Sequence, residues 1–130
     1  MSAIYPALRY LDGERAVRFL TEAFGFEKLF TTPGPAGKIG HAELRLGQDV
    51  VMLSAFSTDP LPDSPADVRV ARMSVYVAVD DVDAHHERAR AAGAEIIMEP
   101  WDTDYGSREY SARDPEGHHW GFGTYRPPAG

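Results

Sequence analysis

The stretch "LRYLDGERAVRFLTEAFG", residues 8–25, combines the end of a strand, a helix start and a helix stop. Asp12 is a suitable N-cap, because its carboxylate can accept a hydrogen bond from an N–H group of the first helical turn. Apolar residues then recur at helical spacing. Gly25 can adopt the left-handed backbone that ends many helices. The stretch therefore predicts a strand followed by an amphipathic helix between Asp12 and Gly25.

The same pattern returns later in "VAVDDVDAHHERARAAG", residues 77–93. Its predicted N-cap, Asp81, lies 69 residues after Asp12, and the turn glycine Gly117 lies 70 residues after Gly47. Self-similarity at a fixed spacing indicates a structural repeat. The chain therefore reads as two copies of one unit.

Each copy combines one helix with four segments of strand character. In the first copy these are "IYPALRY", "FEKLFTT", "IGHAELRL" and "VVMLSAF"; in the second they are "RMSVYVAVD", "AEIIMEP", "SREYSAR" and "HHWGFGTY". We expect an α+β fold of two βαβββ modules within a single domain over 1–130. Module one covers about 3–56, a proline-rich linker 57–71, and module two about 72–126. One helix should cover one face of each sheet, and the other faces should enclose a cavity.

Composition narrows the function. The chain has 130 residues, a formal net charge of −7 and no cysteine. The acidity argues against nucleic acid and anionic membranes as partners, and it favours a neutral or cationic ligand. Without cysteine, neither disulfides nor thiolate metal sites can form. No leader peptide or membrane span is recognisable, so we expect a cytoplasmic protein.

Three segments carry a family resemblance: "YPALRYLDGERAVRFLTEAFGFE", "VAVDDVDAHHERARAAGAEI" and "SREYSARDPEGHHWGF". With them the chain resembles the vicinal oxygen chelate superfamily, which includes glyoxalase I, extradiol dioxygenases, fosfomycin-resistance enzymes and bleomycin-resistance proteins. The resemblance covers nearly the whole chain. It implies a curved mixed sheet around a cavity, a small-molecule ligand and a homodimer.

The resemblance also implies where the metal ligands of family enzymes would lie. Those positions hold Tyr5, Ser74, Gly121 and, in the first module, Val51 or Met52. None of these is a usual ligand of a divalent metal. We therefore expect no metal and no cofactor, as in the metal-free bleomycin-resistance branch.

The last predicted strand, in "DPEGHHWGFG" (Asp114 to Gly123), contains adjacent histidines that suggest a metal site. Alternation along a strand places Trp120 and Phe122 on one face, under the helix, and His119 on the other with Gly121 and Gly123. His118 and His119 then cannot bind one metal together. The glycines either leave space for a ligand or relieve a twist in the strand.

On the third strand, His41 and Glu43 alternate with apolar residues and should share the face opposite the helix. They could bind a metal with His119 as third ligand, bind a ligand by hydrogen bonds, or lie in solvent. His85 and His86 fall on the second helix, where packing is the expected role.

Further polar and aromatic residues point into the same predicted cavity. Alternation along the strands predicts that Arg9 lies on the same face as Tyr5, and that Tyr76 lies on the same face as Ser74. "PWDTDYG" should form a loop with Trp101 and Tyr105 beside carboxylates, which suits a cationic or aromatic ligand. The predicted binding residues are Tyr5, Arg9, His41, Glu43, Ser74, Tyr76, Trp101, Tyr105, His119 and Gly121.

The sequence therefore predicts a metal-free small-molecule binding protein that sequesters its ligand, with antibiotic resistance as one biological setting. The alternative is a glyoxalase-like or dioxygenase-like enzyme with a shifted or absent metal site that uses His41, Glu43 and His119. No complete set of nucleophile, base and orienting residue is visible, so whether the chain catalyses a reaction stays open.

Overall fold

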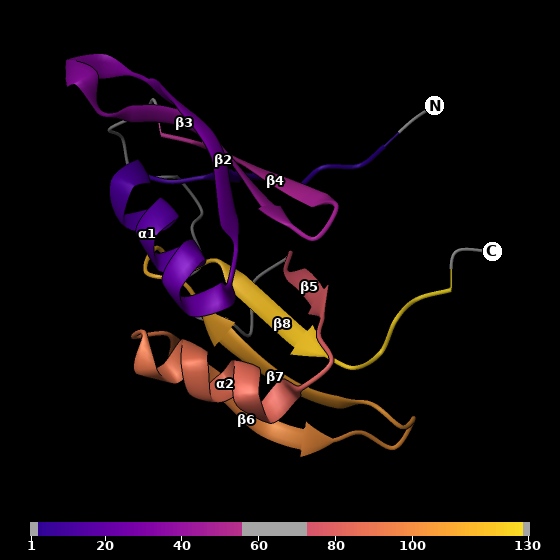
Figure 1. The fold of residues 1–130 in the computed structure, drawn as a ribbon. Coiled ribbons are helices and arrows are strands. Elements are labelled where there is room, and N and C mark those ends of the chain that lie inside the picture. Colours follow the sequence, from indigo (N-terminus) through magenta and orange to yellow (C-terminus); the bar gives the residue numbers. More distant parts are fainter. Residues whose placement is uncertain (1–2, 56–72, 129–130) are drawn as a thin grey trace. The chain divides into compact units, whose positions relative to one another are not determined.

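The computed structural model describes residues 3–55 and 73–128, which belong to two compact units of the chain (Figure 1). The first contains β1 (Ala7–Arg9), α1 (Gly13–Phe24), β2 (Glu27–Pro33), a short 3-10 turn (Pro35–Gly37), β3 (Ile39–Leu46) and β4 (Asp49–Ser54). The second contains β5 (Val75–Ala78), α2 (Val82–Ala91), β6 (Glu95–Asp102), β7 (Arg108–Arg113) and β8 (His119–Gly123). The predicted linker, 57–71, lies outside the described residues.

Each module has a four-stranded mixed sheet with the same topology. The strand order is β1-β4-β3-β2 in the first module and β5-β8-β7-β6 in the second. The first strand of each module pairs in parallel with the last, and the other neighbours are antiparallel. The predicted pair of βαβββ modules is thus confirmed.

Both helices begin and end as the sequence predicts. Asp12 accepts a hydrogen bond from the backbone N–H of Arg15, and Asp81 accepts one from Ala84, each at 3.0 Å. Gly25 follows α1 with a φ of 80°, a left-handed conformation that favours glycine. In the ranges that the structure describes, neither helix is long and apolar enough to cross a membrane.

The core of each module lies between its helix and one face of its sheet. In the first module, Leu20 and Phe24 of α1 and Leu44 of β3 are fully buried. In the second, Trp120 and Phe122 are buried, and the Phe122 ring lies 4.3 Å from the ring of His85 on α2. Each large apolar side chain contributes about 2–3 kcal/mol by this burial. The predicted alternation along β8 is confirmed.

The two helix histidines pack as predicted. Nδ1 of His85 lies 2.5 Å from the hydroxyl of Tyr110, within hydrogen-bond reach. His86 is buried, and its Nε2 lies 2.7 Å from a carboxylate oxygen of Glu99. Both side chains therefore tie α2 to its sheet, on the face away from the candidate site.

Several predicted strand boundaries are wrong. Strand β5 begins only at Val75, so Ser74 lies before it. The first strand is limited to Ala7–Arg9, so Tyr5 lies before it; Pro6 has no N–H group to extend the ladder. Strand β6 continues to Asp102, so Trp101 is a strand residue and not part of a loop. It pairs with Glu109, and this cross-strand pairing outweighs the turn character of "DTDYG" until Thr103.

Candidate functional site

The candidate site lies on the far face of the second sheet, which we define as the face opposite α2. Pairing between neighbouring strands arranges the residues of the site in rows across the sheet. Tyr76 pairs with Gly121, which pairs with Ser111. The next row contains Gly123, Glu109 and Trp101. Residues from four strands thus meet on one surface although they are up to 47 positions apart in the sequence.

The two glycines of β8 differ in what surrounds them. Among the residues that the structure describes, a Cβ at Gly121 would meet only Cδ1 of Tyr76 within 4 Å, at 3.8 Å, an ordinary contact. A Cβ at Gly123 would lie 2.7 Å from both Cγ of Glu109 and the hydroxyl oxygen of Tyr76. Neither glycine has a positive φ. Gly121 therefore leaves space, whereas Gly123 permits a close approach of two polar side chains.

Glu109 lies at the centre of this surface. Its Oε2 accepts a hydrogen bond of 3.0 Å from the hydroxyl of Tyr105. This bond is the main cause that raises the pKa of Tyr105, since it stabilises the protonated phenol. Burial, followed by the nearby charge of Glu109, raises the pKa of Tyr76. Both phenols therefore remain protonated hydrogen-bond donors at neutral pH.

The segment after β8 closes one side of the surface. The hydroxyl of Tyr76 donates a 2.6 Å hydrogen bond to the backbone carbonyl of Tyr125. The backbone N–H of Tyr125 donates to Oγ of Ser107 at 3.2 Å. The Tyr105 and Tyr125 rings meet edge to face, with centroids 6.2 Å apart. Tyr125 is thereby held beside the β6–β7 turn.

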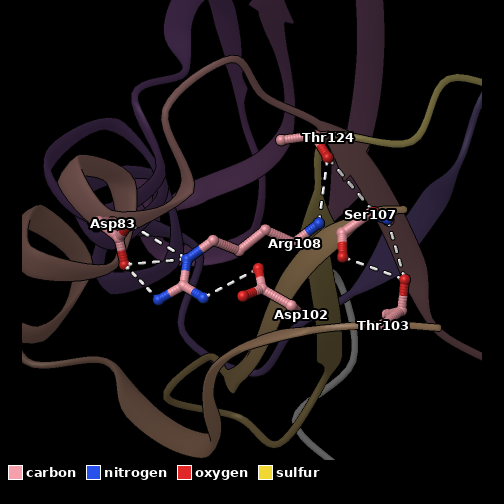
Figure 2. A network of polar contacts seen from close by, with 6 residues as sticks. All are labelled: Asp83, Asp102, Thr103, Ser107, Arg108 and Thr124. Carbon is pink, nitrogen blue, oxygen red and sulfur yellow. Dashed lines mark hydrogen bonds and ion pairs between the residues drawn. The ribbon is translucent and has the colours of Figure 1, made fainter. Parts of the chain in front are cut away.

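That turn is held by a network of polar contacts (Figure 2). Oγ1 of Thr103 donates to the carbonyl of Ser107 at 3.0 Å and accepts from its N–H at 2.9 Å. The N–H of Arg108 donates to Oγ1 of Thr124 at 3.1 Å. These bonds close the turn on itself and on the segment after β8, so the position of Tyr105 within the turn is well defined.

The Arg108 side chain extends the network to α2 (Figure 2). Its Nε and Nη2 atoms donate hydrogen bonds of 3.0–3.3 Å to the carboxylate of Asp83. Its Nη1 atom donates a hydrogen bond of 3.1 Å to Asp102. These bonds raise the pKa of Arg108 and lower that of Asp83. Arg108 therefore fixes the end of β6 against the start of α2.

His119 also lies on the far face, one row from Gly121, and pairs across the sheet with Arg113. It is half-buried. Burial, and secondarily the positive charge of Arg113, lower its pKa below the ordinary value. Its imidazole is therefore neutral at neutral pH and can accept as well as donate a hydrogen bond.

The far face of the first sheet, opposite α1, carries a second polar pair. Nε2 of His41 lies 2.9 Å from Oε2 of Glu43, and 29% and 27% of the two side chains are exposed. The Phe30 ring lies 6.1 Å from the imidazole. Arg9 joins this face through its pairing with Ser54, which also pairs with His41. The carboxylate can orient the imidazole.

The positions at which the resemblance implies metal ligands do not fit a divalent metal. Val51 is buried under α1, whereas Met52 lies on the far face, so Met52 is the first-module counterpart of Gly121. Tyr5 and Ser74 are exposed residues that precede β1 and β5. A thioether, two neutral hydroxyls and a glycine form a poor ligand set. Over 3–55 and 73–128, no group of three His, Asp or Glu side chains could hold a metal ion.

The structure thus distributes the predicted residues between two surfaces. Tyr76, Trp101, Tyr105, His119 and Gly121 gather on the second sheet and its turn, and Arg9, His41 and Glu43 gather on the first. Sequence reasoning missed Glu109 and Tyr125. Strand alternation in "SREYSAR" contained the signal for Glu109, because Tyr110 and Ala112 mark the helix side. No sequence pattern indicated Tyr125.

The chain is similar to known proteins in sequence and in fold. The model of the Glyoxalase/Bleomycin resistance protein/Dioxygenase superfamily matches residues 4–122. An uncharacterized protein of Mycobacterium bovis is 34% identical over 128 residues, covering 93% of this chain and 82% of its own length.

Solved structures agree with this result. TioX from Micromonospora sp. ML1 has 38% sequence identity and a TM-score of 0.77, covering 97% of this chain and 100% of its own. The fosfomycin resistance protein FosX from Mesorhizobium loti shares the fold at 16% identity, with a TM-score of 0.70 and coverage of 96% and 92%. The chain belongs to the Glyoxalase/Bleomycin resistance protein/Dioxygenase superfamily.

Proposed function

We propose that this chain is a small-molecule binding protein that sequesters its ligand without a metal, in the manner of bleomycin-resistance proteins. The observation that carries the proposal is the chemistry of the family's metal positions. They hold Tyr5, Met52, Ser74 and Gly121, none of which supplies a carboxylate or imidazole. Because residue 121 is glycine, no metal-ligating side chain occupies this position, and there is space beside the Tyr76 ring instead.

The surface around this space suits recognition rather than turnover. It offers aromatic rings, phenolic donors and one carboxylate, which can orient a small organic molecule. Its phenols have raised pKa values and are not prepared as bases or nucleophiles. Fosfomycin resistance, which the name of FosX states, is a property of FosX. Resistance by sequestration is one setting in which such a binder would act.

A test combines metal content with ligand binding. Protein purified without chelators should contain well under one equivalent of zinc, nickel, iron, manganese or cobalt, and EDTA should leave its thermal midpoint unchanged. Aromatic compounds of different charge, screened by thermal shift, should raise the midpoint of the unaltered chain. Gly121→Trp should abolish those shifts and keep the basal midpoint. A stoichiometric metal whose removal and return switch an activity off and on would overturn the proposal.

The second candidate is an enzyme that uses the His41–Glu43 pair. A half-buried imidazole 2.9 Å from a carboxylate is an arrangement that serves general-base catalysis. This activity would not need a metal. Turnover of a screened compound that is lost in His41→Gln but retained in His86→Gln would favour the enzyme over the binder.

A further inference from the structure

Four large aromatic side chains with substantial exposure come together around the far face of the second sheet. They come from β5, β6, the β6–β7 turn and the segment after β8, and 39–62% of each is exposed. These residues are Tyr76, Trp101, Tyr105 and Tyr125. Contiguous exposed aromatic surface on a folded domain commonly marks a binding site.

Glu109 connects these residues. Trp101 is its cross-strand partner, and Tyr105 donates a 3.0 Å hydrogen bond to its carboxylate. The absence of a side chain at Gly123 lets Cγ of Glu109 and the hydroxyl of Tyr76 approach the same point. Tyr125 is tied to Tyr76 by a 2.6 Å hydrogen bond. The Glu109 carboxylate thus lies among these aromatic side chains.

The charge of Glu109 is not neutralised by an arginine or lysine of the second module within 73–128. The arginines of this sheet and its flanks pair with other carboxylates: Arg108 with Asp83 and Asp102, Arg113 with Glu95, and Arg126 with Asp80. The only hydrogen bond to the Glu109 carboxylate there comes from a neutral phenol. Within 73–128 Glu109 therefore has no ion-pair partner, although Arg126 is near enough to Tyr76 to act on its pKa.

We propose that Glu109 and the four aromatic side chains bind the cationic group of an organic ligand, a quaternary or protonated amine, whose apolar body lies over Gly121. Aromatic faces attract cations, and the attraction grows when the site is partly desolvated. The carboxylate adds direct charge complementarity, and the net charge of −7 attracts cations towards the chain. This inference rests on the proposed binding function and names the class of its ligand.

Two probes that differ by one methyl group and one charge test the inference. Phenyltrimethylammonium is a permanent cation, and N,N-dimethylaniline is uncharged at neutral pH. Each is titrated into 15N-labelled full-length chain at low salt, with the backbone amides of Gly121 and Gly123 as reporters. The variants are Glu109→Gln, Trp101→Ala and, as a matched control, Glu95→Gln, whose carboxylate already pairs with Arg113.

We expect phenyltrimethylammonium to shift both glycine amides and to bind at least roughly tenfold more tightly than N,N-dimethylaniline, which corresponds to about 1.4 kcal/mol. Glu109→Gln should remove this difference in affinity. Trp101→Ala should weaken the binding of phenyltrimethylammonium several-fold, and this variant keeps the test decisive if Glu109→Gln fails to fold. Glu95→Gln should bind like the unaltered chain.

Failure of the cation site and failure of the proposed binding function would give different results. Equal affinity for both probes, unchanged by Glu109→Gln, would overturn the cation site and leave the binding function standing. If neither probe shifted the two glycine amides, the far face would not bind small aromatic molecules, and the proposed function would fall together with the cation site.

Discussion

Nε1 of Trp120 donates a 3.1 Å hydrogen bond to Oδ2 of Asp114, and both side chains are buried. The other carboxylate oxygen, Oδ1, accepts from the backbone N–H groups of Glu116 and His118 at 3.1 and 3.0 Å. One side chain thus closes the β7–β8 turn and satisfies the indole in the core. The aspartate of "DPEG" has a packing role as well as a turn role.

Replacement of Asp114 should therefore be costly. Asp114→Ala leaves a buried indole N–H without its acceptor and removes two turn bonds, so we expect a loss of about 3 kcal/mol in the free energy of unfolding. Urea denaturation measures this loss. The matched control, Asp104→Ala in the exposed β6–β7 turn, should change stability by no more than about 0.5 kcal/mol. Similar effects at the two sites would contradict the buried role of Asp114.

The two glycines of β8 should respond differently to the same substitution. Gly123→Ala places a Cβ 2.7 Å from Glu109 and Tyr76, which must move apart, so we expect a loss of roughly 1–3 kcal/mol. Gly121→Ala makes an ordinary 3.8 Å contact and should cost less than about 1 kcal/mol. Thermal denaturation of both variants decides this point. If Gly121→Ala were the more destabilising, space at position 121 would not be the reason for its glycine.

His119 should make stability depend on pH. Its pKa in the folded chain is below the ordinary value of 6.5, so the unfolded chain binds a proton more readily. The stability that this shift contributes is present above pH 6.5 and is lost as the pH falls from 6.5 towards the folded pKa. In His119→Gln, thermal midpoints should fall less over this interval, and the difference from the parent should be constant above it. Parallel pH curves for the two proteins would refute the assignment.

We also predict a homodimer, as the family resemblance implies. In the described part of each module, the sheet ends in edge strands, β1 and β2 or β5 and β6, whose outer backbone groups could pair or be covered by a second chain. Light scattering at micromolar concentration should give about twice the chain mass of 14.3 kDa. A monomer mass at that concentration would rule the dimer out.

The repeat extends to an arginine–glutamate pair in each sheet. Arg45 donates a 2.8 Å hydrogen bond to Glu27 in the first sheet, and Arg113 lies 3.1 Å from Glu95 in the second. Both partners are displaced by 68 residues between the modules. The pairing links the second and third strands of each module, and only strand register identifies it as one feature that occurs twice.

The sequence by itself determined the two βαβββ modules, the helix caps at Asp12 and Asp81, and the helix-facing side of β3 and β8. These features depend on short-range periodicity and on backbone groups within a few residues, which a linear pattern records directly. For the same reason the sequence correctly placed His41 and Glu43 on one face.

Only the tertiary structure decided which residues form the candidate site. Glu109, Tyr76 and Tyr125 meet because β5 pairs with β8, β8 pairs with β7, and the segment after β8 returns to the β6–β7 turn. The distinct surroundings of Gly121 and Gly123 follow from the same register. Pairing between strands depends on the free energy of the whole sheet rather than on local preference, so no single stretch of the chain specifies it.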